Sequence, residues 1–121
     1  MTYELTIAGQ LWTVNAERNR HWAWRSTRAK QWRTDAFYTA RAARIPPMDA
    51  CTIVVRVEQA KGRLADPEAH SPPFKACLDG IVDAGVLPDD TGEYVREVTF
   101  CAPTRSADKI DKLVITITPT P

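Results

Sequence analysis

The chain has 121 residues, of which 44% are hydrophobic and 26% are charged, and its net charge at pH 7 is +1. This length and balance fit one globular domain with one core, and they exclude a fibrous protein or a disordered tail. No apolar run approaches the roughly 20 residues that a membrane-spanning helix needs. Residues 1–10 lack a basic stretch followed by an apolar one, so we expect no signal peptide and a cytoplasmic location.

The three cysteines predict neither a disulfide framework nor a zinc site. Cys51, Cys77 and Cys101 are odd in number and lie far apart. Each falls in a segment with apolar periodicity, where a free cysteine behaves as a small buried hydrophobe. We therefore expect three free, buried thiols.

The first predicted element is a strand. Tyr3, Leu5 and Ile7 alternate with polar or small residues, which is the period of a half-buried strand. Residues 11–14 continue this pattern, so we expect the chain to be extended there as well.

A long helix is predicted over residues 26–43. Trp32 and several alanines recur there at helical spacing, Ser26 or Thr27 is available as the N-cap, and a Pro-Pro pair follows the segment. The opposite face carries three arginines on an alanine-rich surface that leaves room for a partner: Arg28, Arg33 and Arg41.

The rest of the chain contains three more predicted strands and a second helix. Phe74, Leu78 and Ile81 lie at helical spacing, whereas the strand segments alternate apolar and polar side chains. The predicted order is a strand at 50–60, a polar loop at 61–71, a helix from Phe74 that ends near Gly85, a loop at 87–92, and strands at 93–101 and 113–118. The order β-α-β-α-β-β predicts a single α+β domain over residues 1–121, with a mixed sheet of about four strands and two main helices.

The charges are unevenly distributed along the chain. Residues 15–45 contain eight basic and two acidic residues, whereas residues 63–93 contain seven acidic and two basic residues. Clustered Lys and Arg side chains suit the phosphates of a polyanion. Clustered carboxylates suit Mg²⁺, which prefers oxygen ligands. A protein that cuts a polyanion needs both kinds of region.

Four carboxylates and one lysine are the candidate chemical groups. Asp66 and Glu68 lie two residues apart in the predicted loop. Asp89 and Asp90 follow the second helix, and Lys75 lies one turn into it. Carboxylates can hold Mg²⁺ for phosphodiester hydrolysis, and a nearby lysine can neutralise charge in the transition state. Each group also has an ordinary interpretation, as a solvated loop acid, a turn former or half of an i, i+4 ion pair.

An ordered series of acids, a lysine and glycines gives the most specific signal. It runs Asp66-Pro-Glu68-Ala69, Lys75, Asp79-Gly80, Ala84-Gly85 and Asp89-Asp90. This series resembles the pattern of the RusA family of Holliday junction resolvases, in which Asp-x-Asp-Asn is followed by Lys, by Asp-Gly or Asp-Ala, and by Ala-Gly and Asp-Asp. Asn15, Asn19 and the basic residues after them are similar to the Asn-rich and basic N-terminal segment of that family.

The resemblance covers residues 3–118, although only the stretch 63–90 is specific. It implies a RusA-like fold, three metal-binding acids at Asp66, Glu68 and Asp90, and an essential lysine at Lys75. It also implies Mg²⁺ as the cofactor, with Mn²⁺ as an alternative, and a homodimer that nicks four-way DNA junctions symmetrically in recombination and repair. A phage or prophage origin in a bacterial host fits the same resemblance.

Two positions depart from the family motif. Glu68 stands where the family has its second Asp, and it can still ligate Mg²⁺ but shifts where the metal sits. Ala69 stands where the family has Asn, and its side chain cannot orient the neighbouring acids through a hydrogen bond. Losses of such supporting contacts reduce metal affinity or activity by about 10- to 100-fold. We therefore expect retained but slower or more metal-selective nuclease activity.

Basic and aromatic residues alternate in the segment 18–33, which suits phosphate contacts and stacking on exposed bases. The competing interpretation is burial, because Trp32 fits the core face of the first helix and at least one of Trp22 and Trp24 is expected to be buried too. The candidate DNA-binding residues are Asn19, Arg20, His21, Arg25, Arg28, Lys30 and Arg33.

Three alternatives remain open on the sequence alone. The first is a branched-DNA-binding protein whose catalysis is weakened by Glu68 and Ala69. The second is a nuclease for flaps, forks or replication intermediates, and the third is a small protein-binding adaptor. The sequence also leaves open whether Asp90 returns to Asp66 because the chain doubles back or because a partner subunit contributes it.

Overall fold

Three helices and one mixed sheet make up the protein, so the predicted α+β class is confirmed. A computed structural model describes all residues from 1 to 121. The elements in chain order are β1 (Tyr3–Ala8), α1 (Val14–Arg18), α2 (Trp22–Ala42), β2 (Cys51–Gln59), α3 (Ser71–Asp83), β3 (Val95–Phe100), β4 (Thr104–Arg105) and β5 (Lys112–Pro119). No helix combines the length and the apolar composition that crossing a membrane would require.

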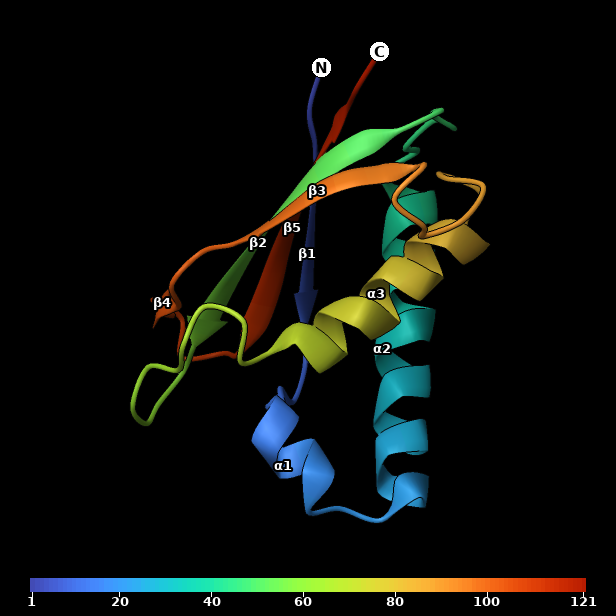
Figure 1. The fold of residues 1–121 in the computed structure, drawn as a ribbon. Helices are drawn as coiled ribbons and strands as arrows, with labels where there is room; N and C mark the ends of the chain where they lie inside the picture. The colour runs from blue at the N-terminus through green and yellow to red at the C-terminus, as the bar shows by residue number, and fades with distance from the viewer.

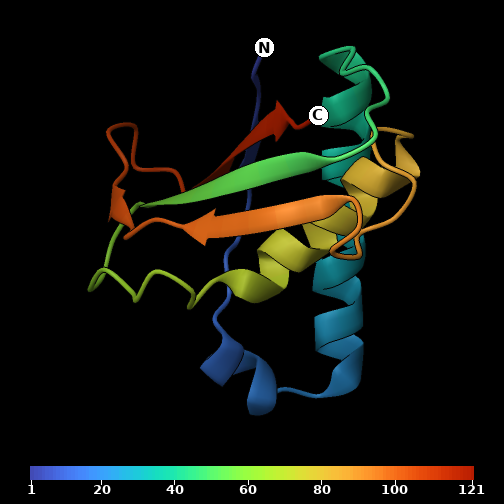
Figure 2. The same ribbon diagram turned by 45° about the horizontal axis from the view of Figure 1, so that its top comes forward.

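The sheet has five strands in the order β1-β5-β2-β3, with the short β4 pairing the far end of β2. Strand β5 lies antiparallel to both β1 and β2, whereas β3 runs parallel to β2. Parallel neighbours need a crossover connection, and α3 supplies it between β2 and β3. Pairing of β1 with β5 also brings the two chain termini to the same end of the molecule (Figures 1 and 2).

Helices α2 and α3 pack against each other and cover one face of the sheet (Figure 1). Strand β2 buries alternate residues on that face, including Ile53, Val55 and Val57, and β5 does the same with Ile115 and Ile117. These side chains join the apolar faces of α2 and α3 in one hydrophobic core. The alternation read from the sequence thus identified the buried side of each central strand.

The contact between α2 and α3 depends on a glycine. Gly80, on the face of α3 toward α2, is buried, and a Cβ atom built there would collide with the backbone carbonyl oxygen of Arg33. The same Cβ atom would lie 3.0 Å from the Cβ of Ala36. Only the absence of a side chain lets the two helix backbones approach this closely.

The N-terminal quarter of the chain differs from the sequence prediction. Strand β1 ends at Ala8, and residues 11–14 do not continue it: the backbone of Thr13 is extended as expected, but helix α1 begins at Val14. The Oγ1 atom of Thr13 accepts a hydrogen bond from the backbone N–H of Ala16 at 3.1 Å and caps α1. A helix of five residues is too short to show a hydrophobic period, so the sequence gave no clear sign of it.

Helix α2 begins at Trp22, four residues before the expected N-cap at Ser26. His21 is the cap, and its Nδ1 atom accepts a hydrogen bond from the backbone N–H of Ala23 at 3.2 Å. Ser, Thr, Asp and Asn are the usual N-caps. Ser26 and Thr27 lie inside α2, so taking one of them as the N-cap placed the predicted start of the helix too late.

The cysteines are free, as expected. Cys51 and Cys77 are buried, and burial raises the pKa of each thiol. Cys101 is only half-buried, contrary to the expectation, because it follows β3, a mostly exposed strand at the edge of the sheet.

Replacing Gly80 with Ala is expected to lower the free energy of unfolding by about 1–3 kcal/mol, because the added methyl group forces α3 away from α2. Alanine has the higher helix propensity by about 1 kcal/mol, so a loss of stability can only come from the helix contact. Urea denaturation measures it.

The control is Gly92→Ala, because nothing lies within 4 Å of a Cβ atom built at Gly92. Its stability should stay within about 0.5 kcal/mol of wild type. If Gly80→Ala were as stable as Gly92→Ala, the close helix contact would not be a constraint.

Candidate functional site

The loop between β2 and α3 places Asp66 and Glu68 in one cleft. Two backbone hydrogen bonds of 3.1 Å shape this loop as a turn. The N–H of Ala69 donates to the carbonyl of Asp66, and the N–H of Ser71 donates to the carbonyl of Glu68. The cleft has a volume of about 220 Å³, and both acids line it together with Asn15 and its neighbours in α1. Pro67 therefore does not prevent the two carboxylates from facing the same space.

Helix α1, which the sequence did not predict, forms the opposite wall of this cleft. The N–H of Val14 donates a hydrogen bond of 3.0 Å to the carbonyl of Ala69, which ties the start of α1 to the acidic loop. Ala69 occupies the position where the RusA motif has Asn. Here the main chain of Ala69, rather than a side chain, makes the hydrogen bonds that shape the loop.

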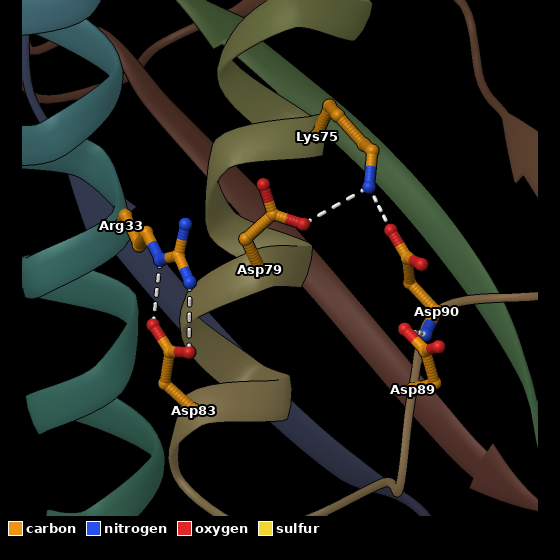
Figure 3. Close-up of polar contacts among 6 residues, drawn as sticks. All are labelled: Arg33, Lys75, Asp79, Asp83, Asp89 and Asp90. Atoms are coloured by element: carbon orange, nitrogen blue, oxygen red, sulfur yellow. Dashed lines mark hydrogen bonds and ion pairs between the residues drawn. The ribbon is translucent and has the colours of Figure 1, made fainter.

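The chain doubles back after α3 and brings Asp90 to Lys75 (Figure 3). The ammonium group of Lys75 contacts the carboxylate of Asp90 and also that of Asp79, at 2.9 Å. The Oδ1 atom of Asp89 accepts a hydrogen bond from the N–H of Asp90 at 2.8 Å, which fixes the turn. The chain thus doubles back, but it brings Asp90 to Lys75 of α3 and not to Asp66 and Glu68.

The three carboxylates predicted to bind a metal are not gathered into one group. Asp66 and Glu68 line the cleft beside α1, whereas Asp90 lies against Lys75. No group of three or more His, Cys, Asp or Glu side chains is placed to hold a metal ion. The pair in the cleft still satisfies the usual Mg²⁺ pattern of one or two carboxylates completed by water and substrate phosphate.

His70, next to the acidic loop, is buried with 6% of its surface exposed. Its Nδ1 atom has no hydrogen-bond partner. Burial lowers the pKa of His70, and the negative charge of Asp111 acts in the opposite direction. His70 therefore packs at the start of α3.

The predicted DNA-binding residues lie on α2 and the segment before it, but several already have partners in the protein. The guanidinium of Arg33 forms two hydrogen bonds to Asp83, of 2.6 and 2.9 Å (Figure 3). The guanidinium groups of Arg20 and Arg28 each lie 5.1 Å from the centre of the Trp24 ring. Lys30 is exposed and forms no ion pair within the chain.

The other three candidates also differ in their contacts. The side-chain amide of Asn19 donates a hydrogen bond to the carbonyl of Asn15 at 3.2 Å, and His21 is occupied as the cap of α2. The guanidinium of Arg25 lies 4.0 Å from the Glu17 carboxylate, at the outer limit of an ion pair. Because Arg25 is also half-exposed, a ligand can still reach it. Arg25 and Lys30 are therefore the cations on α2 with the fewest competing contacts.

The tryptophans divide into a buried group and one exposed residue. Trp32 is buried as predicted, and Trp24 is partly buried against the core. Trp12 is buried as well, edge-on to both of these rings, and the sequence gave no role to it. Trp22, with 64% of its surface exposed, is the one tryptophan that stands in solvent.

A second cavity, of about 370 Å³, lies between α1 and the first turns of α2 and α3. Arg25 from α2 and Lys75 from α3 both line it, although 50 residues separate them. Glu17 of α1 lines the same cavity, while Asn15 of α1 lines the acidic cleft. Asp79 lines it too, so this interhelical cavity holds two cations and two carboxylates, and residues 12–17 stand between it and the acidic cleft.

The comparisons with known proteins give no family for this chain. No protein-family model matches the sequence, and no curated protein matches it significantly.

The ion pair between Arg33 and Asp83 predicts a pH-dependent contribution to stability. Asp83 ends α3, where the helix dipole disfavours a negative charge, and the hydrogen bonds from Arg33 compensate by lowering the pKa of Asp83. A carboxyl whose pKa is lowered by folding stabilises the protein above its unfolded pKa, and this contribution is lost as the pH falls through the folded pKa.

Asp83→Asn is therefore expected to lower the unfolding free energy at neutral pH by about 0.2–1 kcal/mol, a small value because solvent screens this exposed pair. The difference from wild type should shrink at about pH 3, where carboxyls become protonated. Urea denaturation at both pH values measures it, with the exposed Asp49→Asn as control. If Asp83→Asn were less stable than wild type by the same amount at both pH values, the ion pair would not make the pH-dependent contribution predicted here.

Proposed function

We propose that this protein is a Mg²⁺-dependent, structure-specific DNA endonuclease that resolves four-way junctions by paired symmetric nicks in recombination and repair. The carrying observation is the position of residues 12–17, which line both the cleft of Asp66 and Glu68 and the interhelical cavity, where the cations Arg25 and Lys75 lie beside two carboxylates. A nuclease needs a metal-binding site next to a phosphate-binding surface. The resemblance to the RusA family over residues 63–90 supports the same assignment.

In this proposal Asp66 and Glu68 hold the metal ion, with Mn²⁺ as an alternative to Mg²⁺. Both carboxylates are exposed in the cleft, so water and a phosphate oxygen can complete the coordination. When bound, the metal would supply a nucleophilic hydroxide and polarise the phosphoryl group. The RusA resemblance makes Asp90 the third ligand, and Asp90 would have to leave Lys75 to take that role.

Lys75 is proposed to neutralise charge on the phosphate as the bond breaks. Its side chain is 56% exposed and lines the interhelical cavity, and two carboxylates orient its ammonium group. Removing one preorganised hydrogen-bond donor from the position where negative charge develops costs other enzymes about 2.7–4 kcal/mol of transition-state stabilisation. Two symmetric nicks need two such sites, so the proposal includes a homodimer with two-fold symmetry.

The first test is cleavage of a labelled four-way junction in Mg²⁺ or Mn²⁺, with linear duplex and a flap substrate alongside. Wild type should make paired nicks in the junction. Asp66→Asn and Asp90→Asn should each cleave the junction about 100-fold or more slowly than wild type. A neutral amide binds the metal weakly at either position, and at position 90 it also no longer orients Lys75.

Asp49→Asn is the matched control, because Asp49 is exposed and lines neither cavity, and this variant should cleave normally. Cleavage of the flap alone would assign the protein to another group of structure-specific nucleases. No cleavage of any branched substrate would remove the nuclease proposal.

A second candidate function is branched-DNA binding with weakened catalysis. The observation in its favour is that the ion pair to Lys75 holds Asp90 apart from Asp66 and Glu68. This candidate predicts tight binding to the junction without nicks at any metal concentration. The same substrate panel distinguishes it from the nuclease.

The basic surface of α2 gives a separate prediction for DNA affinity. Lys30→Ala and Arg25→Ala should each weaken binding and reduce the slope of log Kd against log salt concentration by about 0.9, because each lost phosphate contact releases one fewer counterion. Fluorescence anisotropy with a labelled junction measures both quantities.

Arg56→Ala is the control, because Arg56 is exposed on β2 and points away from the helix-covered face. It should leave the slope unchanged. Equal slopes for all variants would exclude this face of α2 from the DNA interface.

A further inference from the structure

Trp22 lines the interhelical cavity with an exposed side chain. It is the first residue of α2, and its one ring contact is with the neighbouring His21, whose ring centre lies 5.8 Å away with a tilt of 35°. The other three tryptophans, Trp12, Trp24 and Trp32, pack together in or against the core. An indole with 64% of its surface in water keeps most of its apolar area unburied, which leaves it available to a ligand.

The cavity beside Trp22 has the size and lining of a small-ligand site. Its volume of about 370 Å³ falls within the usual range for such sites, roughly 300–1,000 Å³. Pro72 and Ala76 from α3 and Ala29 from α2 supply apolar walls, and Ser26 supplies a hydroxyl group. The cavity thus combines an exposed aromatic ring with apolar walls and a hydroxyl group.

The charged groups of the cavity lie in two close pairs, Arg25 with Glu17 and Lys75 with Asp79, so they suit a ligand that carries both an anionic group and hydrogen-bond donors. Arg25 and Lys75 supply two cations. Glu17 is fixed by a hydrogen bond of 2.9 Å from the Nε1 atom of Trp12 to its Oε2 atom, and its Oε1 atom lies 4.0 Å from Arg25. The carboxylates of Glu17 and Asp79 can accept hydrogen bonds from amino groups, while the cations meet a phosphate.

A nucleotide has all three of these features, namely a flat aromatic base, exocyclic amino groups and a phosphate. We propose that the cavity receives one unpaired nucleotide of branched DNA, with its base stacked on Trp22 and its phosphate contacted by Arg25 and Lys75. Naming DNA as the ligand rests on the proposed function. A base inside a continuous duplex has both faces covered by its neighbours, so only a nucleotide at a branch, bulge or gap can stack on Trp22.

Occupation of the cavity would also affect the neighbouring carboxylates. A phosphate on Lys75 competes with Asp79 and Asp90 for the same ammonium group. Binding of an unpaired nucleotide therefore weakens the contact that holds Asp90 at α3. This couples recognition of DNA structure to the position of Asp90.

The test compares binding to a duplex with one unpaired 2-aminopurine nucleotide and to the same duplex fully paired, in buffer without divalent metal so that no strand is cut. Wild type should prefer the duplex with the unpaired base and quench its fluorescence on binding. Trp22→Ala should reduce this preference by about 5- to 150-fold, the equivalent of stacking one base on an aromatic ring.

Two variants serve as controls. Trp22→Phe keeps an aromatic ring and should retain most of the preference and of the quenching. Tyr38→Ala removes a side chain that is 65% exposed on the same helix but lies outside the cavity, and it should behave as wild type. Because Trp22 is exposed, its replacement should not unfold the protein, which circular dichroism verifies.

The outcomes separate this inference from the proposed function. The inference is overturned if wild type and Trp22→Ala prefer the unpaired base equally, or if wild type shows no such preference. Either result would count against it even if wild type cuts junctions. A preference that depends on Trp22 supports the inference even if wild type cuts no branched substrate, in which case the nuclease proposal alone fails.

Discussion

The close packing of α3 on α2 is the constraint on which the rest of this structure depends. Gly80 lets the backbone of α3 approach the Arg33 carbonyl and Ala36, and this contact fixes which residues of the two helices face each other. Lys75 and Asp79 consequently face the N-terminal half of α2, and Asp83 reaches Arg33. The Asp-Gly pair in the sequence therefore has a packing reason, independent of any chemistry at the neighbouring carboxylate.

The electrostatics of the site arise from the same packing. The packing of the two helices joins the basic segment to the acidic one through the pair of Arg33 and Asp83. Arg25 and Lys75 also have carboxylates nearby, each from its own segment. Exposed pairs of this kind contribute about 0–1 kcal/mol each to stability. Their larger effect in our proposal is on binding, because a DNA phosphate has to compete with Asp79 and Asp90 for Lys75 and with Glu17 for Arg25.

The sequence predicted the core more fully than the site. The alternation in β2 and the helical spacing in α3 correctly predicted the burial of Val55, Phe74, Leu78 and Ile81. The site was harder, because its geometry depends on short or unusual local features. Helix α1 starts from a threonine cap, and the cap of α2 is a histidine, so both starts lay outside the patterns that mark longer helices. Without α1, neither the acidic cleft nor the interhelical cavity could be foreseen.

By itself, the sequence determined the α+β class, the buried face of each main element, the separation of basic from acidic segments and the order of the candidate carboxylates. Only the tertiary structure decided that Asp90 meets Lys75, that Arg33 is paired with Asp83, and that α1 stands between two cavities. The physical reason is that periodicity records which side of an element avoids water. It does not record which distant side chain will lie opposite, since that depends on how whole helices pack.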